Sequence, residues 1–191
     1  FKLSPNKIII FYPAQFWAHK NHKYIIDAAE ILKNENNTKY LFVFCGGNKG
    51  NFEYIKDLII KKQLDSIIKI LNFISDDEII SLYLHSNGVV MPTYCGPTGL
   101  PIYESFYFKK IIFYTKGLIP NDSINEHMIN IDITSPIDFC RKLDVYSNPS
   151  KINKIVEDNY EYYKEVCSEN TFKNNYEKIL NEFSYLLNRW K

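Results

Sequence analysis

A segment rich in glycine and proline, residues 95–105, carries residue types that suit phosphate binding. It follows the apolar run Gly88–Met91, and we expect a helix to begin at Pro101, because proline is favoured at the first helical position. Free backbone amides over residues 100–103 and the positive end of the helix dipole would together bind an anion. Glu104, in the first turn of this helix, would repel a phosphate placed on it but suits hydroxyl groups attached to that phosphate. The segment therefore predicts a site for a nucleoside diphosphate with its ribose.

The composition is typical of a globular protein. The chain has 191 residues, of which 46% are hydrophobic and 24% charged. We expect a single domain over residues 1–191. The net charge of +1 and the lack of a basic run argue against nucleic acid or a membrane surface as a partner. No apolar run approaches the roughly 20 residues of a transmembrane segment, and a start at Phe1 followed at once by a predicted strand suggests a piece of a larger protein.

Residues that could bind a metal are scattered. The cysteines are Cys45, Cys95, Cys140 and Cys167, and they lack the paired short spacings of a zinc site or redox motif. We expect them to be reduced and mostly buried, which favours a cytoplasmic location. His19 and His22 could share a helical face as metal ligands, but no acidic or cysteine partner lies nearby in sequence. We therefore expect no metal site and favour a packing role in the loop.

Short apolar runs rich in β-branched residues alternate with amphipathic stretches. Continuous apolar runs separated by helices are typical of strands buried on both faces of a parallel sheet. We predict an α/β fold with a doubly wound, Rossmann-like parallel sheet of about six strands and helices at the C-terminal end. The runs are Ile8–Tyr12, Tyr40–Cys45, Ile67–Leu71, Val89–Met91, Ile111–Tyr114 and a weaker Met128–Ile131.

Several helices have recognisable start signals. Ser75 and Glu78 have the spacing of a capping box, and Ser135 with Pro136 provides an N-cap followed by a first-position proline. After about residue 150 we expect two helices, roughly 151–166 and 171–190, with Ser168 as a cap between them. Their aromatic residues recur every three or four positions, which favours helix faces packed on the core over a stacking platform for bases.

Three loops, over residues 13–22, 45–51 and 94–104, would lie at the carboxyl ends of the strands, where such sheets bind ligands. With their flanking segments they resemble the C-terminal, donor-binding half of a family 4 (group 1) glycosyltransferase of the GT-B fold. The matching segments, in the family's order, are Tyr12–Trp17 with His19–His22, Phe42–Gly47, Phe73–Tyr83, Gly99–Glu104 and Ser168–Leu180.

Two positions depart from the family's pattern. The family commonly has a second glutamate eight positions before Glu104, where this chain has Gly96. It usually also has a basic residue a few positions before Lys20, where this chain has Ala14 and Gln15. Both changes put the family's handling of the donor sugar in question here, while the residues expected at the nucleotide end are kept.

The resemblance implies a domain that works with an amino-terminal acceptor domain absent from this chain. The donor would be a nucleoside diphosphate sugar and the acceptor a glycan or lipid-linked glycan, with retention of configuration and no tightly bound cofactor or metal. It implies a bacterial, cytoplasmic, hexosyltransferase-type enzyme of polysaccharide biosynthesis, placed at the inner face of the membrane in the full-length protein. The isolated domain would bind without catalysing. Because the family's last helices also touch the other domain, we expect an exposed apolar patch on them.

The resemblance also implies roles for individual residues. Lys20 and the amides of residues 99–100 would bind the diphosphate, and Glu104 would bind the ribose. The backbone at residues 73–74 would border the base, and the glycines at 46–47 would let the second loop approach the nucleotide. The candidate donor-binding residues are Lys20, Gly46, Gly47, Phe73, Ile74, Thr98, Gly99, Leu100 and Glu104. The resemblance identifies no catalytic residue in this chain.

Structural explanations and other functions stay open. Lys20 could be a solvated lysine at a helix start, Glu104 a first-turn carboxylate that complements the dipole, and residues 46–47 ordinary turn glycines. A nucleotide-sugar epimerase or phosphorylase of the same build is one alternative function, although no compelling acid–base pair or cofactor lysine is evident. A non-catalytic phosphate-binding α/β module is another, although no acidic cluster follows the first strand.

Overall fold

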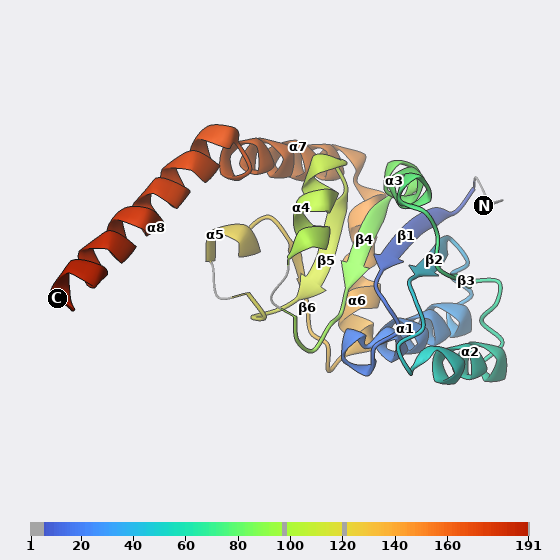
Figure 1. Ribbon diagram of the computed structural model, residues 1–191. Coiled ribbons are helices and arrows are strands. Elements are labelled where there is room, and N and C mark those ends of the chain that lie inside the picture. Colours follow the sequence, from blue (N-terminus) through green and yellow to red (C-terminus); the bar gives the residue numbers. More distant parts are fainter. Residues whose placement is uncertain (1–5, 97–98, 120–121, 191) are drawn as a thin grey trace.

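A sheet of parallel strands forms the centre of this computed structural model, which describes residues 6–96, 99–119 and 122–190. The strands are β1 (Ile8–Pro13), β2 (Tyr40–Cys45), β3 (Ile68–Leu71), β4 (Gly88–Met91), β5 (Ile111–Thr115) and β6 (Ile129–Ile131). Their order is β3-β2-β1-β4-β5-β6, so the direction of winding reverses between β1 and β4. All neighbouring pairs are parallel, which places the carboxyl ends of the strands at one edge (Figure 1). The predicted doubly wound fold is confirmed.

Helices cover both faces of this sheet (Figure 1). They are α1 (His22–Asn34), α2 (Phe52–Lys61), α3 (Asp76–His85), α4 (Leu100–Tyr107), α5 (Asp122–Asn125), α6 (Pro136–Lys142), α7 (Pro149–Val166) and α8 (Glu169–Arg189), with the 3₁₀ turns η1 (Ala18–Lys20) and η2 (Leu143–Ser147). The α1 helix packs against α2 and α6 on one face. On the other face α3 packs on β1, and α4 packs on β4 and β5 and contacts α7.

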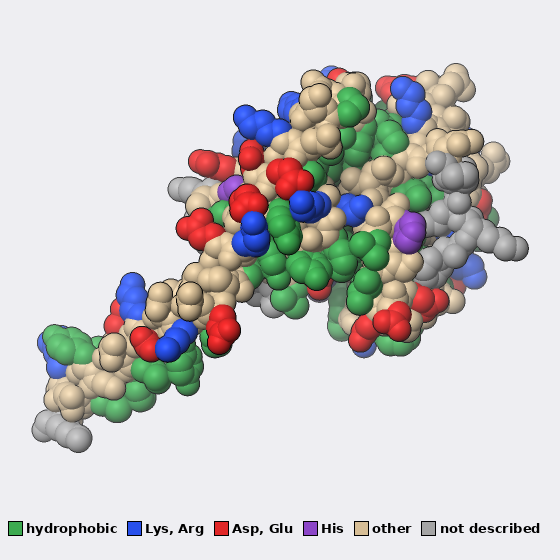
Figure 2. All heavy atoms as spheres, turned by 90° about the horizontal axis from the view of Figure 1, so that it is seen from above, with side chains coloured by type: hydrophobic (Ala, Val, Ile, Leu, Met, Phe, Trp, Pro, Cys, Tyr) green, Lys and Arg blue, Asp and Glu red, His purple; other side chains and the backbone are tan. Residues whose placement is uncertain are grey.

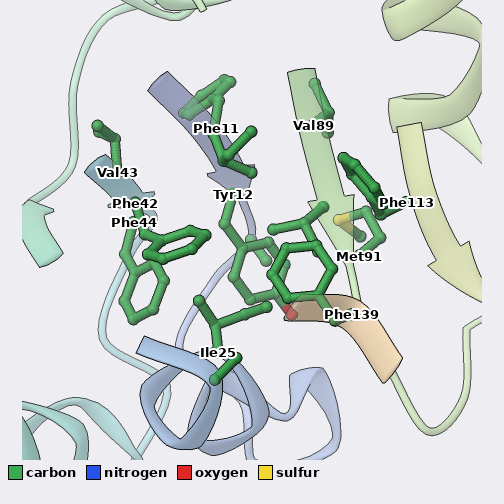
Figure 3. Close-up of a cluster of buried hydrophobic side chains, with 14 of the residues drawn as sticks. Phe11, Tyr12, Ile25, Phe42, Val43, Phe44, Val89, Met91, Phe113 and Phe139 are labelled. Carbon is green, nitrogen blue, oxygen red and sulfur yellow. The ribbon is translucent and has the colours of Figure 1, made fainter. Parts of the chain in front are cut away.

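The central strand β1 is buried on both faces. Tyr12 points to the α1 face, where its ring meets Phe44 edge to face at 5.8 Å, and Figure 3 shows both rings near Ile25 of α1. Phe11 points to the opposite face and meets Tyr83 of α3 at 5.2 Å. Because successive residues of a strand face opposite sides, a strand between two helical layers must be apolar at every position. This explains the continuous apolar run in the sequence.

The helix start signals are mostly confirmed. The Ser75 hydroxyl accepts from the Glu78 amide, and the Glu78 carboxylate accepts from the Ser75 amide, which completes the predicted capping box before α3. Ser168 accepts a backbone hydrogen bond in the first turn of α8, as predicted. Pro136 is the first residue of α6, but the Ser135 side chain makes no capping hydrogen bond. The Ser135 backbone carbonyl instead accepts a hydrogen bond from a backbone amide in the first turn of α6.

The α8 helix extends away from the sheet layers (Figure 1), and none of its described residues is buried. The prediction that its aromatic residues pack on the core is therefore wrong, although Tyr162 and Tyr163 of α7 do pack there. Figure 2 shows hydrophobic side chains gathered along this projecting helix, so the predicted apolar patch is confirmed. The exposed apolar residues of α8 and its C-terminal end are Phe172, Tyr176, Ile179, Leu180, Phe183, Tyr185, Leu186, Leu187 and Trp190.

The cysteines are free, but only Cys45 is buried. Cys140 is partly buried, while Cys95 lies exposed in the loop after β4 and Cys167 lies exposed between α7 and α8. The expectation that they are mostly buried is therefore wrong, because two of them fall in connections at the surface. Over the ranges that the structure describes, no helix has the length and apolar character needed to cross a bilayer.

Candidate functional site

A cavity of about 550 Å³ opens at the carboxyl edge of the sheet, beside the point where the strand order reverses. Small-molecule sites in proteins commonly have volumes of about 300–1,000 Å³. The three predicted loops line this cavity, and the loop after β3 joins them. The lining residues are Pro13, Ala14, Gln15, Trp17, His19, Lys20, Cys45, Gly46, Gly47, Phe73, Ile74, Ile79, Met91, Leu100, Pro101 and Glu104.

Most of the predicted binding residues lie together in this cavity. Those that line it are Lys20, Gly46, Gly47, Phe73, Ile74, Leu100 and Glu104. Gly99 is the N-cap residue of α4 and does not line the cavity, and Thr98 lies outside the described residues. Trp17 and Ile79 also line the cavity; they lie inside the matching segments but were not candidate residues, and Met91 lies outside those segments. Met91 ends β4, so its position at a strand terminus was the available signal.

The loops after β1 and β2 run side by side and form one wall of the cavity. The Ala14 amide donates to the Cys45 carbonyl at 3.0 Å, and the Phe16 amide donates to the Gly47 carbonyl at 3.0 Å. The Phe16 carbonyl in turn accepts from the Asn51 amide at 3.1 Å. The parallel pairing of β1 and β2 therefore continues past the ends of the strands and holds both loops in register.

The two glycines of the second loop have different surroundings. A Cβ atom at Gly46 would lie 2.3 Å from the Ala14 carbonyl oxygen and 2.7 Å from the Gln15 Cα, so only glycine fits against the first loop. This supports the structural explanation for Gly46. A Cβ atom at Gly47 would have no heavy atom within 4 Å, and this residue lines the open cavity. The role of leaving room for a ligand therefore stays a prediction for Gly47.

Lys20 is the last residue of η1, and its carbonyl accepts a hydrogen bond from the buried Tyr12 hydroxyl. Asn21 then adopts a left-handed conformation, with φ of 57°, that turns the chain into α1. The Lys20 ammonium lies 3.4 Å from where a Cβ atom of Gly96 would be, so it reaches across to the turn after β4. Among the described residues no carboxylate forms an ion pair with it. Its charge is available to an anion in the cavity.

The α4 helix begins at Leu100, one residue earlier than predicted, with Gly99 as N-cap and Pro101 at the second position. The amides of Ile102 and Tyr103 both donate to the Gly99 carbonyl, at 2.9 and 3.3 Å. Proline has no N–H group. The prediction of free amides over residues 100–103 is therefore wrong, because the earlier start uses two of these donors inside the helix. Of the three N–H groups in residues 100–103, these bonds leave over that of Leu100.

Glu104 consequently lies in the second turn of α4, and no acidic residue occupies the first turn. The dipole effect falls off beyond the first turn, so the structural explanation for this carboxylate is weak. The Tyr83 hydroxyl donates to Glu104 Oε2 at 2.6 Å. Burial, reinforced by the charge of Glu104, raises the pKa of Tyr83, so its hydroxyl keeps the proton and fixes the carboxylate at the cavity wall. Sequence reasoning missed this partner, which lies at the end of the segment 73–83.

Much of the remaining lining of the cavity is apolar. Phe73 is 86% exposed in the loop after β3, and Ile74 beside it is half-buried. Trp17 lies at the rim, and its indole N–H donates to Gln15 Oε1 at 3.1 Å. Burial raises the pKa of the Cys45 thiol to about 11, so this lining group is neutral near pH 7. The cavity thus combines charged groups with aromatic and aliphatic surface.

His22 is fully buried behind the first loop. Its ring stacks on Phe16 at 4.5 Å and lies 4.5 Å from the Tyr12 ring, and neither ring nitrogen has a hydrogen-bond partner. Burial lowers the pKa of His22 to about 3, an effect that the neighbouring Ala14 carbonyl opposes only partly. His22 therefore packs the loop as a neutral ring, whereas His19 lines the cavity. The described part of the chain contains no group of three or more histidine, cysteine or acidic residues placed to hold a metal.

The fold is that of a Rossmann-like α/β domain, and the cavity lies where the strand order reverses, which is where such sheets bind their ligands. The chain belongs to the family Glycosyl transferases group 1, whose pattern it matches over residues 1–173. The family inferred from the sequence motifs is thereby confirmed. A comparison with curated proteins gave no match.

Solved structures of glycosyltransferases have the same fold. A glycosyltransferase from Rickettsia africae is similar with a TM-score of 0.80 at 22% identity, over 94% of this chain and 48% of that one. The C-terminal domain of a group 1 glycosyl transferase (LpcC) from Francisella tularensis is similar with a TM-score of 0.71 at 23% identity, over 86% of this chain and 87% of that domain. Anabaena Alr3699/HepE in complex with UDP has a TM-score of 0.79 at 13% identity, over 93% of this chain and 49% of that one. This chain thus spans about half of the Rickettsia and Anabaena proteins.

Proposed function

We propose that residues 1–191 form the donor-binding domain of a glycosyltransferase that moves a hexose from a nucleoside diphosphate sugar to the hydroxyl of a glycan or lipid-linked glycan, with retention. An amino-terminal domain would supply the acceptor site, so the chain alone binds without transferring. Membership of the family supports glycosyl transfer. The Anabaena neighbour is described with UDP, with UDP and glucose, and with UDP-glucose, which favours a uridine diphosphate donor. The proposed setting is bacterial polysaccharide synthesis on the cytoplasmic side of a membrane.

The observation that carries this proposal is the position of the Lys20 ammonium next to the turn that leads into α4. A helix start and a lysine without an ion pair among the described residues face the same space. Both are groups that stabilise phosphate oxygens, through the helix dipole and a direct positive charge. A pyrophosphate placed there would interact with both at once.

The remaining lining groups match the rest of a nucleotide. Glu104, held by Tyr83, presents a carboxylate that accepts hydrogen bonds from ribose hydroxyls, and such charge-assisted bonds are strong. The apolar lining residues Phe73 and Ile74 suit a base, whose flat faces favour apolar contact. As the bond to the sugar breaks, negative charge develops on the leaving diphosphate, and a lysine held beside it lowers the barrier. Lys20 is the residue to which we assign this role.

Calorimetric titration of the chain with UDP, GDP and dTDP, their sugar conjugates, and inorganic pyrophosphate tests the proposal. We expect one nucleoside diphosphate to bind. Lys20→Gln should lower its affinity by about tenfold or more, because hydrogen bonds to charged groups contribute about 1.5–3 kcal/mol. Lys23→Gln is the matched control, because Lys23 is exposed and paired with Asp27. Glu104→Gln should weaken the nucleoside diphosphate much more than pyrophosphate.

Two results would contradict the proposal. One is a folded chain that binds none of these compounds at millimolar concentration. The other is a Glu104→Gln variant whose affinities for pyrophosphate and for the nucleoside diphosphate fall equally, because Glu104 would then have no role in binding the ribose. Incubation of the chain with a radiolabelled sugar nucleotide and an acceptor glycan checks that binding occurs here without transfer.

A further inference from the structure

Thr93, two residues beyond the end of β4, is 1% exposed and directs its hydroxyl toward two backbone carbonyls. One is the Cys95 carbonyl at 2.6 Å, and the other is the His19 carbonyl at 3.0 Å, which lies 74 residues away in the chain. A hydroxyl has a single hydrogen to donate, so the two carbonyls share it. The Thr115 hydroxyl of β5 donates to the Thr93 carbonyl at 2.8 Å and fixes the residue at the sheet edge. Thr93 therefore ties the turn after β4 to the loop after β1.

A second buried hydroxyl acts on the same loop. The Tyr12 hydroxyl of β1 donates to the carbonyl of Lys20, and burial raises the pKa of Tyr12, so it remains a donor. The Tyr94 amide adds a hydrogen bond of 2.9 Å to the His19 carbonyl. The successive carbonyls of His19 and Lys20 are thus held by groups from β1 and from the segment after β4. The main chain that carries the Lys20 side chain has little freedom to move.

We propose that the Tyr12 and Thr93 hydroxyls, here called the hydroxyl pair, are positioning groups that hold the Lys20 loop against the turn after β4. This inference rests on the proposed function of the site. A lysine side chain loses rotational freedom when it binds an anion, and a mobile main chain would add its own loss of conformational entropy. A main chain that is already fixed avoids this second cost. Without the hydroxyl pair, the Lys20 ammonium would sample positions away from Gly96 and from the start of α4. Neither hydroxyl needs to touch the ligand.

Three variants test the hydroxyl pair by calorimetric titration with inorganic pyrophosphate. Thr93→Val replaces the hydroxyl by a methyl group of similar size, and Tyr12→Phe removes only the phenolic oxygen. We expect each substitution to lower the affinity for pyrophosphate by about three- to tenfold, which is the net effect of losing one neutral hydrogen bond. Thr93→Ser, which keeps the hydroxyl, should bind like the wild type. The control is Tyr40→Phe, which removes a buried hydroxyl that donates to the Leu143 carbonyl at 3.2 Å, at the amino end of β2.

A double-mutant cycle separates positioning from a general loss of stability. In a Lys20→Gln background the Thr93→Val and Tyr12→Phe substitutions should have almost no further effect on pyrophosphate binding, because the group that they position is gone. Equal losses with and without Lys20, or wild-type binding by the folded Thr93→Val and Tyr12→Phe variants, would overturn the inference. If Thr93→Val does not fold, Tyr12→Phe decides alone. A wild-type chain that binds neither pyrophosphate nor UDP would overturn the proposed function and this inference with it.

Discussion

Two adjacent glycines allow a sharp test, because Gly46→Ala and Gly47→Ala add the same methyl group one residue apart. At Gly46 the new Cβ atom would lie 2.3 Å from the Ala14 carbonyl oxygen and 2.6 Å from its carbon. These are backbone atoms of a loop held by two 3.0 Å hydrogen bonds, so the loops must separate and the bonds lengthen. Overpacking of this kind destabilises by about 1–3 kcal/mol. At Gly47 the methyl group would have no heavy atom within 4 Å among the described residues beyond its chain neighbours.

Thermal unfolding followed by circular dichroism measures the difference. A domain of this size loses about 2–4 °C of Tm per kcal/mol, so we expect Gly46→Ala to melt about 2–12 °C below the wild type. Gly47→Ala should melt at the wild-type temperature or slightly above it, because the alanine restricts the unfolded chain. Its donor binding should nevertheless weaken, since the methyl group enters the cavity. Equal Tm values for the two variants, or a lower value for Gly47→Ala, would refute the assignment of Gly46 to packing and Gly47 to the site.

Three further predictions concern buried groups and the projecting helix. Burial lowers the pKa of His22 from 6.5 to about 3, so below pH 6.5 the unfolded chain takes up a proton that the folded chain does not. The free energy of unfolding should therefore fall by up to about 1.4 kcal/mol per pH unit from pH 6.5 toward pH 3. His22→Phe should remove this dependence, which thermal melts at pH 7 and pH 5 would measure. Tyr83→Phe removes the 2.6 Å hydrogen bond to Glu104 and should weaken a nucleoside diphosphate several-fold with pyrophosphate unchanged; an equal loss for both ligands in titration would contradict the role of Tyr83. Phe183 lies on the exposed α8 helix, so Phe183→Ala should change the free energy of unfolding by less than about 0.5 kcal/mol. Phe139 is fully buried, and Phe139→Ala should lower the free energy of unfolding by about 3–5 kcal/mol. Similar values for the two variants in denaturant titrations would mean that α8 packs on the core.

Local chemistry explains why much of the fold was predictable. The β1 run is apolar at every position because both faces of a central strand are covered, and that requirement is visible in sequence. The capping box at Ser75 and Glu78 needs only residues three apart, so nothing distant can change it much. The start of α4 was misplaced by one residue because Gly99 and Pro101 both suit a helix start, and only the backbone bonds to the Gly99 carbonyl distinguish them.

The apolar stripe on α8 shows where periodicity stops being informative. Residues such as Phe172, Tyr176 and Phe183 recur at helical spacing, which establishes that one face is apolar. The same pattern arises whether that face packs on this domain or stays open to another surface. Only the path of the chain after Val166 decided that the helix leaves the sheet layers.

By itself the sequence determined the strands, the helix start signals and the loops that carry the candidate residues, because these depend on neighbours within a few positions. The tertiary structure decided which of these residues meet. Strand order brought the Lys20 loop to the turn after β4, and packing of α3 on β1 brought Tyr83 to Glu104, 21 residues away. Hydrogen bonds between groups so far apart in the chain exist only after the sheet has formed, so no local pattern encodes them.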